Sequence, residues 1–209
     1  MPIATHNNLG SKKAIIKTLI KIKMANFNLF IPILQKIEGG YQQLSKDGGN
    51  YNSLGQNVGT NYGISARFYE DIIGRPPTVA DMKAITKEKA KVLFKKYFWD
   101  DVHADRMNNQ SIANLITDHA INSGESPIGK MVQEILRNDF RKNLKIDGDI
   151  GPQTVSAINS VNQKQLFDKI KRARNEHYNQ IGGEYLSSWL SRLKKFSFQK
   201  NDLPSGQVA

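Results

Sequence analysis

Residues 26–40 read Asn-Phe-Asn-Leu-Phe-Ile-Pro-Ile-Leu-Gln-Lys-Ile-Glu-Gly-Gly. Apolar residues recur in this stretch at spacings of three and four, which defines one apolar stripe over about three helical turns: Phe27, Phe30, Ile33, Leu34 and Ile37. Asn26 is a suitable N-cap, and the paired glycines at 39 and 40 end the helix. The pattern therefore predicts a helix that finishes at Glu38.

Glu38 stands at the C-terminus of this helix, where the helix dipole disfavours a negative charge and favours the protonated carboxyl group. A glycosidase needs one protonated acid that donates to the leaving oxygen, and a second group that handles water or the developing positive charge. Asp47 follows nine residues later in a glycine-rich stretch and is the candidate for the second role. From spacing alone, Glu38 is equally a surface residue, and Asp47 before two glycines is equally a turn residue.

Three motifs follow one another along the chain: Glu-Gly-Gly-Tyr at 38–41, Lys-Asp-Gly-Gly at 46–49, and Thr-Asn-Tyr-Gly-Ile-Ser at 60–65. Together they resemble glycoside hydrolase family 108, a family of N-acetylmuramidases, and also the phage-type lysozymes. The resemblance implies that Glu38 is the general acid, and that Asp47 with Thr60 positions water or stabilises the transition state. Residues 50–59 separate the Asp-Gly-Gly turn from Thr60, which leaves Ser53 as an alternative site hydroxyl.

Later motifs extend the resemblance over roughly residues 27–195. Residues 93–99, Leu-Phe-Lys-Lys-Tyr-Phe-Trp, match a family helix that ends in Tyr-Trp. Residues 118–124 and 147–154 resemble the family's companion, a predicted peptidoglycan-binding domain. The expected organisation is a basic N-terminal extension, a catalytic region, a helical peptidoglycan-binding region packed on it, and a polar tail: 1–24, 25–105, 106–198 and 199–209.

The same resemblance indicates substrate-binding residues. Tyr41 and Tyr62 are expected to stack against sugar rings, and Asn122 is expected to shape the cleft floor. Core packing is the competing role for the tyrosines, and a buried hydrogen-bonding network is the competing role for Asn122 with Asp118. Trp99 is expected in the core or between lobes.

The rest of the chain is mostly helical by pattern. Ser65 and Thr86 are suitable N-caps, and Thr78 with Asp81 forms a capping-box pattern. The predicted helices are 65–73, 78–84, 86–98, 108–123, 127–142, 152–161, 163–181 and 184–195. Residues 41–64, rich in Gly and Asn, predict a hairpin or an irregular loop lobe. The expected fold class is mainly α, an α+β lysozyme-like arrangement with a helical body and a small Gly-rich β-hairpin lobe beside the active-site cleft.

Composition excludes several functions. The 209 residues are 39% hydrophobic, enough for one good core or two small ones. The absence of cysteine excludes disulfides, a Cys-based zinc site and a cysteine nucleophile, and with them a papain-like peptidase. The four histidines lack metal-site spacing, and residues 147–149 lack the remaining ligands of a calcium loop. No metal or other cofactor is expected.

The net charge of +11 favours polyanionic partners. The basic residues are scattered over helical faces without a stacking platform of aromatics, so nucleic acid is not the expected partner. Peptidoglycan is the expected substrate, and the protein is expected to be a monomer. A transmembrane run of about 18 apolar residues is missing from the sequence.

Lysines at 17, 21 and 23 interrupt the apolar N-terminal stretch, so we expect no secretion signal, and Met24 is an alternative start. The protein would then be made in the cytoplasm and reach the periplasm or cell wall through a holin, a secretion system or lysis. Phage endolysin, exported toxin and wall-remodelling enzyme all stay open. Two rival activities also stay open: a lytic transglycosylase that uses Glu38 alone, and a non-catalytic wall-binding module.

Overall fold

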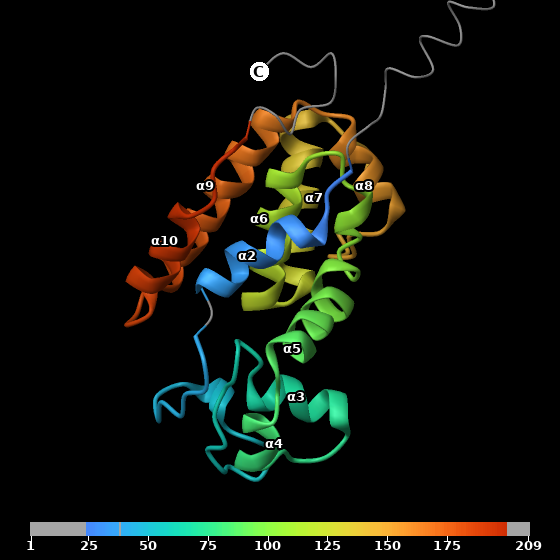
Figure 1. Ribbon diagram of the computed structural model, residues 1–209. Coiled ribbons are helices and arrows are strands. Elements are labelled where there is room, and N and C mark those ends of the chain that lie inside the picture. The colour runs from blue at the N-terminus through green and yellow to red at the C-terminus, as the bar shows by residue number, and fades with distance from the viewer. Residues whose placement is uncertain (1–23, 38, 200–209) are drawn as a thin grey trace, which may run out of the picture.

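A computed structural model describes residues 24–37 and 39–199, without the side chains of residues 35–37. The expected N-terminal extension, except Met24, and the expected tail, except Gln199, lie outside the described residues. Within them the fold is mainly helical, as predicted (Figure 1). None of the described helices is long and apolar enough to cross a membrane.

The opening stretch forms the helix α2 (Phe27–Ile37). The side-chain oxygen of Asn26 accepts a hydrogen bond of 2.8 Å from the backbone N–H of Asn28, which confirms Asn26 as the N-cap. Phe27, Phe30 and Leu34 are buried, and the two phenylalanine rings lie 5.6 and 5.7 Å from the ring of Trp99. Trp99 is thus a core residue, in agreement with the sequence.

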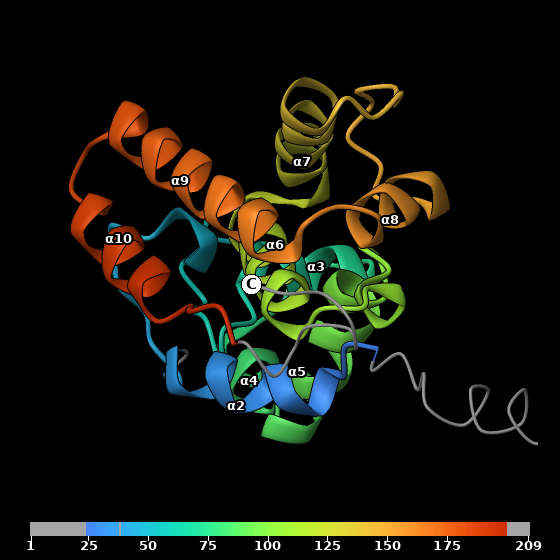
Figure 2. The same ribbon diagram turned by 90° about the horizontal axis from the view of Figure 1, so that it is seen from above.

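The helix α6 (Gln110–Ser123) forms the centre of the body. Every residue from 110 to 120 is buried, a pattern typical of a helix covered on all sides. Its neighbours include α2, α7 (Glu125–Phe140) and α9 (Gln163–Ile181), and Figure 2 shows α6 surrounded by them. The helices α8 (Pro152–Asn159) and α10 (Leu186–Lys194) complete the body.

The segment Asp147–Asp149 is a turn that is hydrogen-bonded to α7. The Gln133 side chain donates a hydrogen bond of 2.8 Å to the Asp147 carboxylate and accepts one of 2.8 Å from the Gly148 N–H. Gly129 of α7 packs against this turn, and a Cβ added to Gly129 would lie 1.9 Å from the Gly148 carbonyl oxygen. Only glycine permits this close approach of backbone to backbone.

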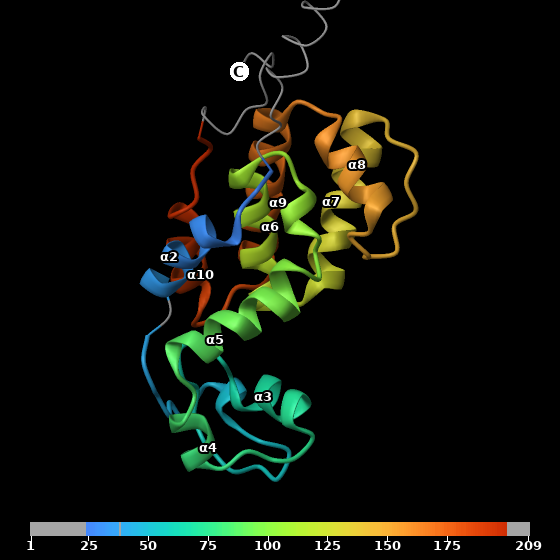
Figure 3. The same ribbon diagram turned by 45° about the vertical axis from the view of Figure 1, so that its right-hand side comes forward.

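A smaller lobe contains α3 (Ala66–Ile73) and α4 (Val79–Lys83), and α5 (Lys87–Phe94) leads from it back to the body (Figure 3). All three helices begin where the sequence predicts. Ser65 and Thr86 accept their capping hydrogen bonds, and Thr78 forms the capping box with Asp81. After α5 the chain continues through a π-helical turn (Lys95–Trp99) and a 3₁₀ turn (Ala104–Arg106).

The lobe is irregular, which was the alternative predicted for residues 41–64, and the β-hairpin of the expected fold class is not seen among the described residues. The described residues contain isolated antiparallel bridges, Gln42 with Thr60, Tyr51 with Asn57 and Asn61 with Ile64, and a 3₁₀ turn at Gly48–Asn50. Asparagine side chains explain the difference, since they bind the backbone groups that a ladder would use. Asn52, for example, accepts hydrogen bonds from two backbone N–H groups, those of Leu54 and Gln56.

Candidate active site

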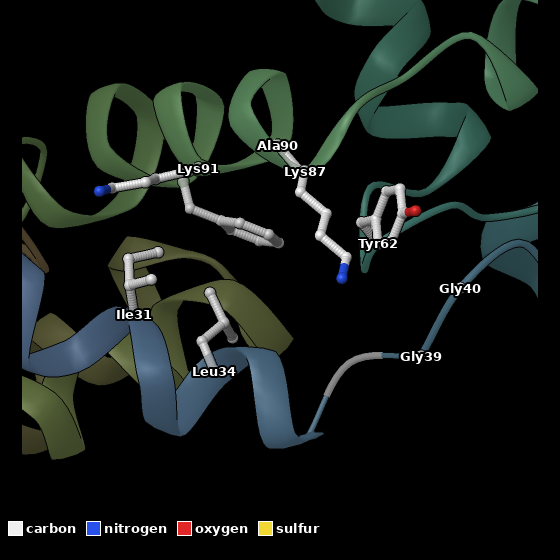
Figure 4. Close-up of a pocket in the computed structure, with 9 residues that line it drawn as sticks. Ile31, Leu34, Gly39, Gly40, Tyr62, Lys87, Ala90 and Lys91 are labelled. Carbon is white, nitrogen blue, oxygen red and sulfur yellow. The ribbon is translucent and has the colours of Figure 1, made fainter.

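A pocket of about 210 Å³ lies at the C-terminal end of α2 (Figure 4). Its apolar floor comes from two facing helices, with Ile31 and Leu34 on α2 and Ala90 and Phe94 on α5. The remaining lining residues are Gly39, Gly40, Tyr62, Lys87 and Lys91. The pocket therefore offers an apolar surface beside an aromatic ring and two cations.

Glu38, the expected general acid, lies outside the described residues. Leu34, four residues before it, and Gly39, directly after it, both line the pocket. The role of Glu38 as general acid therefore stays a prediction from the sequence.

Lys87 contributes a positive charge that the sequence motifs did not indicate. Figure 4 shows its amino group pointing into the gap between Tyr62 and α2, whereas that of Lys91 points away. The Lys87 Nζ lies 5.8 Å from the centre of the Tyr62 ring. Lys87 is also the first residue of α5, where the helix dipole adds positive potential. This side of the pocket suits an oxygen-rich or anionic group.

Tyr62 is held at the pocket in an uncommon backbone conformation. Its φ is +47°, in the left-handed region, which costs a residue with a side chain on the order of 1 kcal/mol. The neighbouring Asn61 maintains it, because its buried amide donates hydrogen bonds to the carbonyls of Met82 and Ile85 at 2.9 and 3.2 Å. The hydrogen bonds of Asn61 thus hold the chain beside Tyr62, which forms part of the pocket wall.

Asp47 caps the 3₁₀ turn that follows it. One carboxylate oxygen accepts a hydrogen bond of 2.9 Å from the Gly49 N–H, and the other accepts one of 3.1 Å from the Gln42 side chain. The alternative role as a turn residue is therefore present in the structure. Among the described residues each oxygen accepts one of these two bonds, and a carboxylate oxygen can accept a further hydrogen bond from water.

Asn50 joins Thr60 to the same group of side chains. Its fully buried amide exchanges two hydrogen bonds with Gln42, at 2.9 and 3.0 Å, and donates one to the Leu44 carbonyl. The Thr60 hydroxyl donates a bond of 2.6 Å to the Asn50 side-chain oxygen. Asp47 and Thr60, distant in sequence, thus meet in one network through Gln42 and Asn50. Sequence reasoning missed both linking residues, since amides in a loop carry no distinctive motif.

Ser53, the alternative hydroxyl, lies elsewhere in the lobe. It is exposed, and its backbone N–H donates a hydrogen bond of 2.8 Å to Glu70 of α3. The structure therefore links Thr60, and not Ser53, with Asp47.

Tyr41 has a structural contact of its own. Its hydroxyl donates a hydrogen bond of 3.1 Å to the Val58 carbonyl, and the Lys83 amino group lies 5.0 Å from the ring centre. Burial raises the pKa of the Tyr41 hydroxyl, which stays a hydrogen-bond donor at neutral pH. Tyr41 is absent from the lining of the pocket beside Gly39, so the two tyrosines differ in their surroundings.

Asn122 lines a different hollow, together with residues of α10. Its amide donates a hydrogen bond of 2.5 Å to the carbonyl of Asp118 on the preceding turn. The Asp118 carboxylate is fully buried and accepts bonds of 2.7 Å from both Arg174 and Arg192. Asp118 therefore belongs to a buried network that ties α6, α9 and α10 together, the competing role considered from sequence.

The described residues contain no cluster of three or more His, Cys, Asp or Glu side chains arranged to hold a metal ion. The buried His119, for example, packs against the ring of Tyr178. Burial, with the charges of Arg174 and His177, lowers the pKa of His119 to about 3. It is therefore a neutral core residue at physiological pH.

Comparison with known proteins connects this geometry to two families. The model of the family Glycosyl hydrolase 108 matches residues 31–124, and that of the Predicted Peptidoglycan domain matches residues 128–194. Among solved structures, SagA of Brucella abortus is similar, with 26% sequence identity and a TM-score of 0.65 over 84% of this chain and 97% of that chain. The comparison with curated proteins found no match.

The first match contains the pocket and the Asp47 network, and the second contains most of α7 and all of α8, α9 and α10. Residues 31–124 are therefore similar to the glycosyl hydrolase 108 family, and residues 128–194 are similar to the predicted peptidoglycan domain family.

Proposed function

We propose that this protein is an N-acetylmuramidase. The matches to the two families support a glycoside hydrolase that acts on peptidoglycan. It would cleave the β-1,4 bond between N-acetylmuramic acid and N-acetylglucosamine. The observation that carries the proposal is the pocket at the end of α2, whose lining includes Leu34 before Glu38 in the chain and Gly39 after it. An apolar floor beside a polar rim suits the two faces of a sugar ring.

Glu38 is the proposed general acid. It would protonate the glycosidic oxygen as the bond to the anomeric carbon breaks, while a water molecule adds to that carbon. Asp47 would accept the proton from this water or stabilise the positive charge of the transition state. The hydrogen bonds from Gly49 and Gln42 support this role, because they hold the carboxylate in one orientation. Thr60, fixed by Asn50, would help to position the water.

We further propose that the configuration at the anomeric carbon is inverted, by analogy with the phage-type lysozymes. An inverting enzyme leaves room for water between its carboxyl groups, which then lie about 6.5–9.5 Å apart. The substrate lies outside the cytoplasm, so the protein would reach it through export or after lysis.

A lytic transglycosylase is the second candidate. One observation favours it: both Asp47 oxygens are engaged within the lobe's own turn, as expected if Asp47 is structural. Glu38 would then act alone as acid and base, and the substrate's own hydroxyl would replace water to form a 1,6-anhydro end.

Digestion of purified peptidoglycan sacculi, followed by mass analysis of the released fragments, tests the proposal. Reducing N-acetylmuramic acid ends would establish the muramidase, and anhydro ends would establish the transglycosylase instead. Binding to sacculi without any release would overturn both activities and leave a wall-binding module. An Asp47→Asn variant tested in parallel should lose most turnover if the carboxylate handles water.

A further inference from the structure

The turn between α9 and α10 reaches from the body to the lobe beside Asp47. The Tyr185 hydroxyl donates a hydrogen bond of 3.0 Å to the backbone carbonyl of Lys46, the residue before Asp47. The Lys46 amino group also lies 3.6 Å from the carboxylate of Glu184. Figure 1 shows this turn at the end of the body that faces the lobe. The predicted peptidoglycan domain thus contacts the loop that carries a proposed catalytic residue.

Aromatic rings continue from this contact along α10. The rings of Tyr185 and Trp189 lie 6.2 Å apart, and Trp189 lies 5.6 Å from Tyr178 on α9. Tyr185 is 42% exposed, and Trp189 is half-buried. Each of these two rings is partly packed against the protein and partly open to solvent. The open part of such a ring can contact an apolar surface of a ligand.

The Trp189 ring borders a hollow of about 310 Å³ whose other lining is polar. The hollow is also lined by an amide, by hydroxyl groups and by positively charged side chains, which belong to Asn122, Ser188, Ser191, Arg192 and Lys195. This combination matches an N-acetylated sugar, which has an apolar C–H face for the indole and hydroxyl and acetamido groups for the polar side chains. The Lys195 amino group suits the carboxylate of a muramic acid or of its attached peptide, whereas Arg192 is already paired with Asp118.

We propose that this hollow is a sugar-binding subsite for the glycan strand, and that α10 extends the cleft beyond the lobe. Tyr185 lies between the Asp47 loop and Trp189, so one strand would pass from the site of cleavage along the aromatic row into the hollow. The peptidoglycan domain would then hold the same strand that the hydrolase region cleaves. This inference rests on the proposed function for the identity of the ligand.

Two neighbouring serines on α10 provide matched variants. Ser187 and Ser188 are both exposed, but only Ser188 lines the hollow. Ser188→Gln adds an uncharged side chain to the hollow, and Ser187→Gln makes the same change outside it. Glutamine is a good helix former, so both variants should fold.

The readout is tryptophan fluorescence with a soluble tetrasaccharide of alternating N-acetylglucosamine and N-acetylmuramic acid, in the full chain with Glu38→Gln to prevent turnover. The chain has two tryptophans, and Trp99 is only 1% exposed, so quenching by acrylamide reports mainly on Trp189. The tetrasaccharide should protect Trp189 from quenching. Ser188→Gln should bind it about ten-fold more weakly, and Ser187→Gln should bind it as the parent does. Equal affinities in the two variants, or no protection at saturation, would overturn the subsite.

Turnover of sacculi separates this inference from the proposed function. With Glu38 intact, Ser188→Gln should raise KM and leave kcat within about two-fold, because the hollow lies away from the cleaved bond. Cleavage with the same KM in both serine variants would overturn the subsite alone. Protection of Trp189 in a protein that never cleaves sacculi would overturn the hydrolase and support the subsite.

Discussion

Replacing Asn50 with alanine should disorganise the lobe around Asp47 and Thr60. The Asn50 side chain makes four hydrogen bonds: two with Gln42, one with the Leu44 carbonyl and one with the Thr60 hydroxyl. It is also fully buried, so it cannot exchange these partners for water in the native state. Alanine removes all four hydrogen bonds at once, and the polar groups of Gln42, Leu44 and Thr60 that formed them lose this partner.

The expected loss of stability follows from these contacts. A hydrogen bond contributes about 0.5–1.5 kcal/mol net, and an unsatisfied buried partner costs more. Here Gln42, Leu44 and Thr60 are at least partly exposed, so water can replace much of what is lost. Each of the four hydrogen bonds should therefore contribute an amount in the lower part of this range. We expect Asn50→Ala to lower the free energy of unfolding by about 2–3 kcal/mol. Turnover should fall at least about ten-fold, because Asp47 and Thr60 lose their common anchor.

Urea unfolding followed by circular dichroism measures the stability, and fragment release from sacculi measures the turnover. Asn57→Ala is the matched control from the same lobe. The Asn57 side chain donates one long hydrogen bond of 3.3 Å to Gln43, so its loss should cost about 0.5 kcal/mol or less. If Asn50→Ala is no less stable and no less active than Asn57→Ala, the network does not hold the site together.

Two further predictions concern the body. Gly129→Ala should cost at least about 2 kcal/mol in urea unfolding despite the better helix propensity of alanine, because its Cβ would meet the Gly148 backbone at 1.9 Å. Gly48→Ala, with no atom near its Cβ, is the control, and an equal effect in both would refute the packing argument. Stability should also fall as pH is lowered from about 6.5 toward 3, because the unfolded chain takes up a proton at His119 that the native state, with its pKa of about 3, does not. His119→Gln should make the free energy of unfolding less dependent on pH across this window, and an unchanged dependence would contradict the assignment.

Local signals in the sequence predicted the helices well. Ser65, Thr78 with Asp81, and Thr86 each cap a helix where their side chains can reach the third following N–H, a relation contained within one turn. The small differences occur where a local rule was incomplete. The helix α7 begins at Glu125, two residues before the expected start, because Pro127 fits within the first turn of a helix.

Features that depend on distant contacts were not predictable in the same way. Each hydrogen bond of the Asn50 network joins residues up to ten positions apart through side chains, within the irregular loop that was the alternative to a hairpin. Lys87 enters the pocket only because α5 packs opposite α2. Tyr185 and Lys46 are 139 residues apart, so their contact depends on the packing of the whole body.

The most direct test of the account compares Glu38→Gln with Glu88→Gln in the release of fragments from sacculi. Glu88 is an exposed glutamate of α5 that is not among the residues lining the pocket, so it controls for the loss of one carboxylate. Removal of a general acid typically costs about 10²–10⁴ in rate, so Glu38→Gln should fall at least about 100-fold while Glu88→Gln stays within about two-fold of the parent. A Glu38→Gln protein that is folded and keeps most of its activity would contradict the central claim.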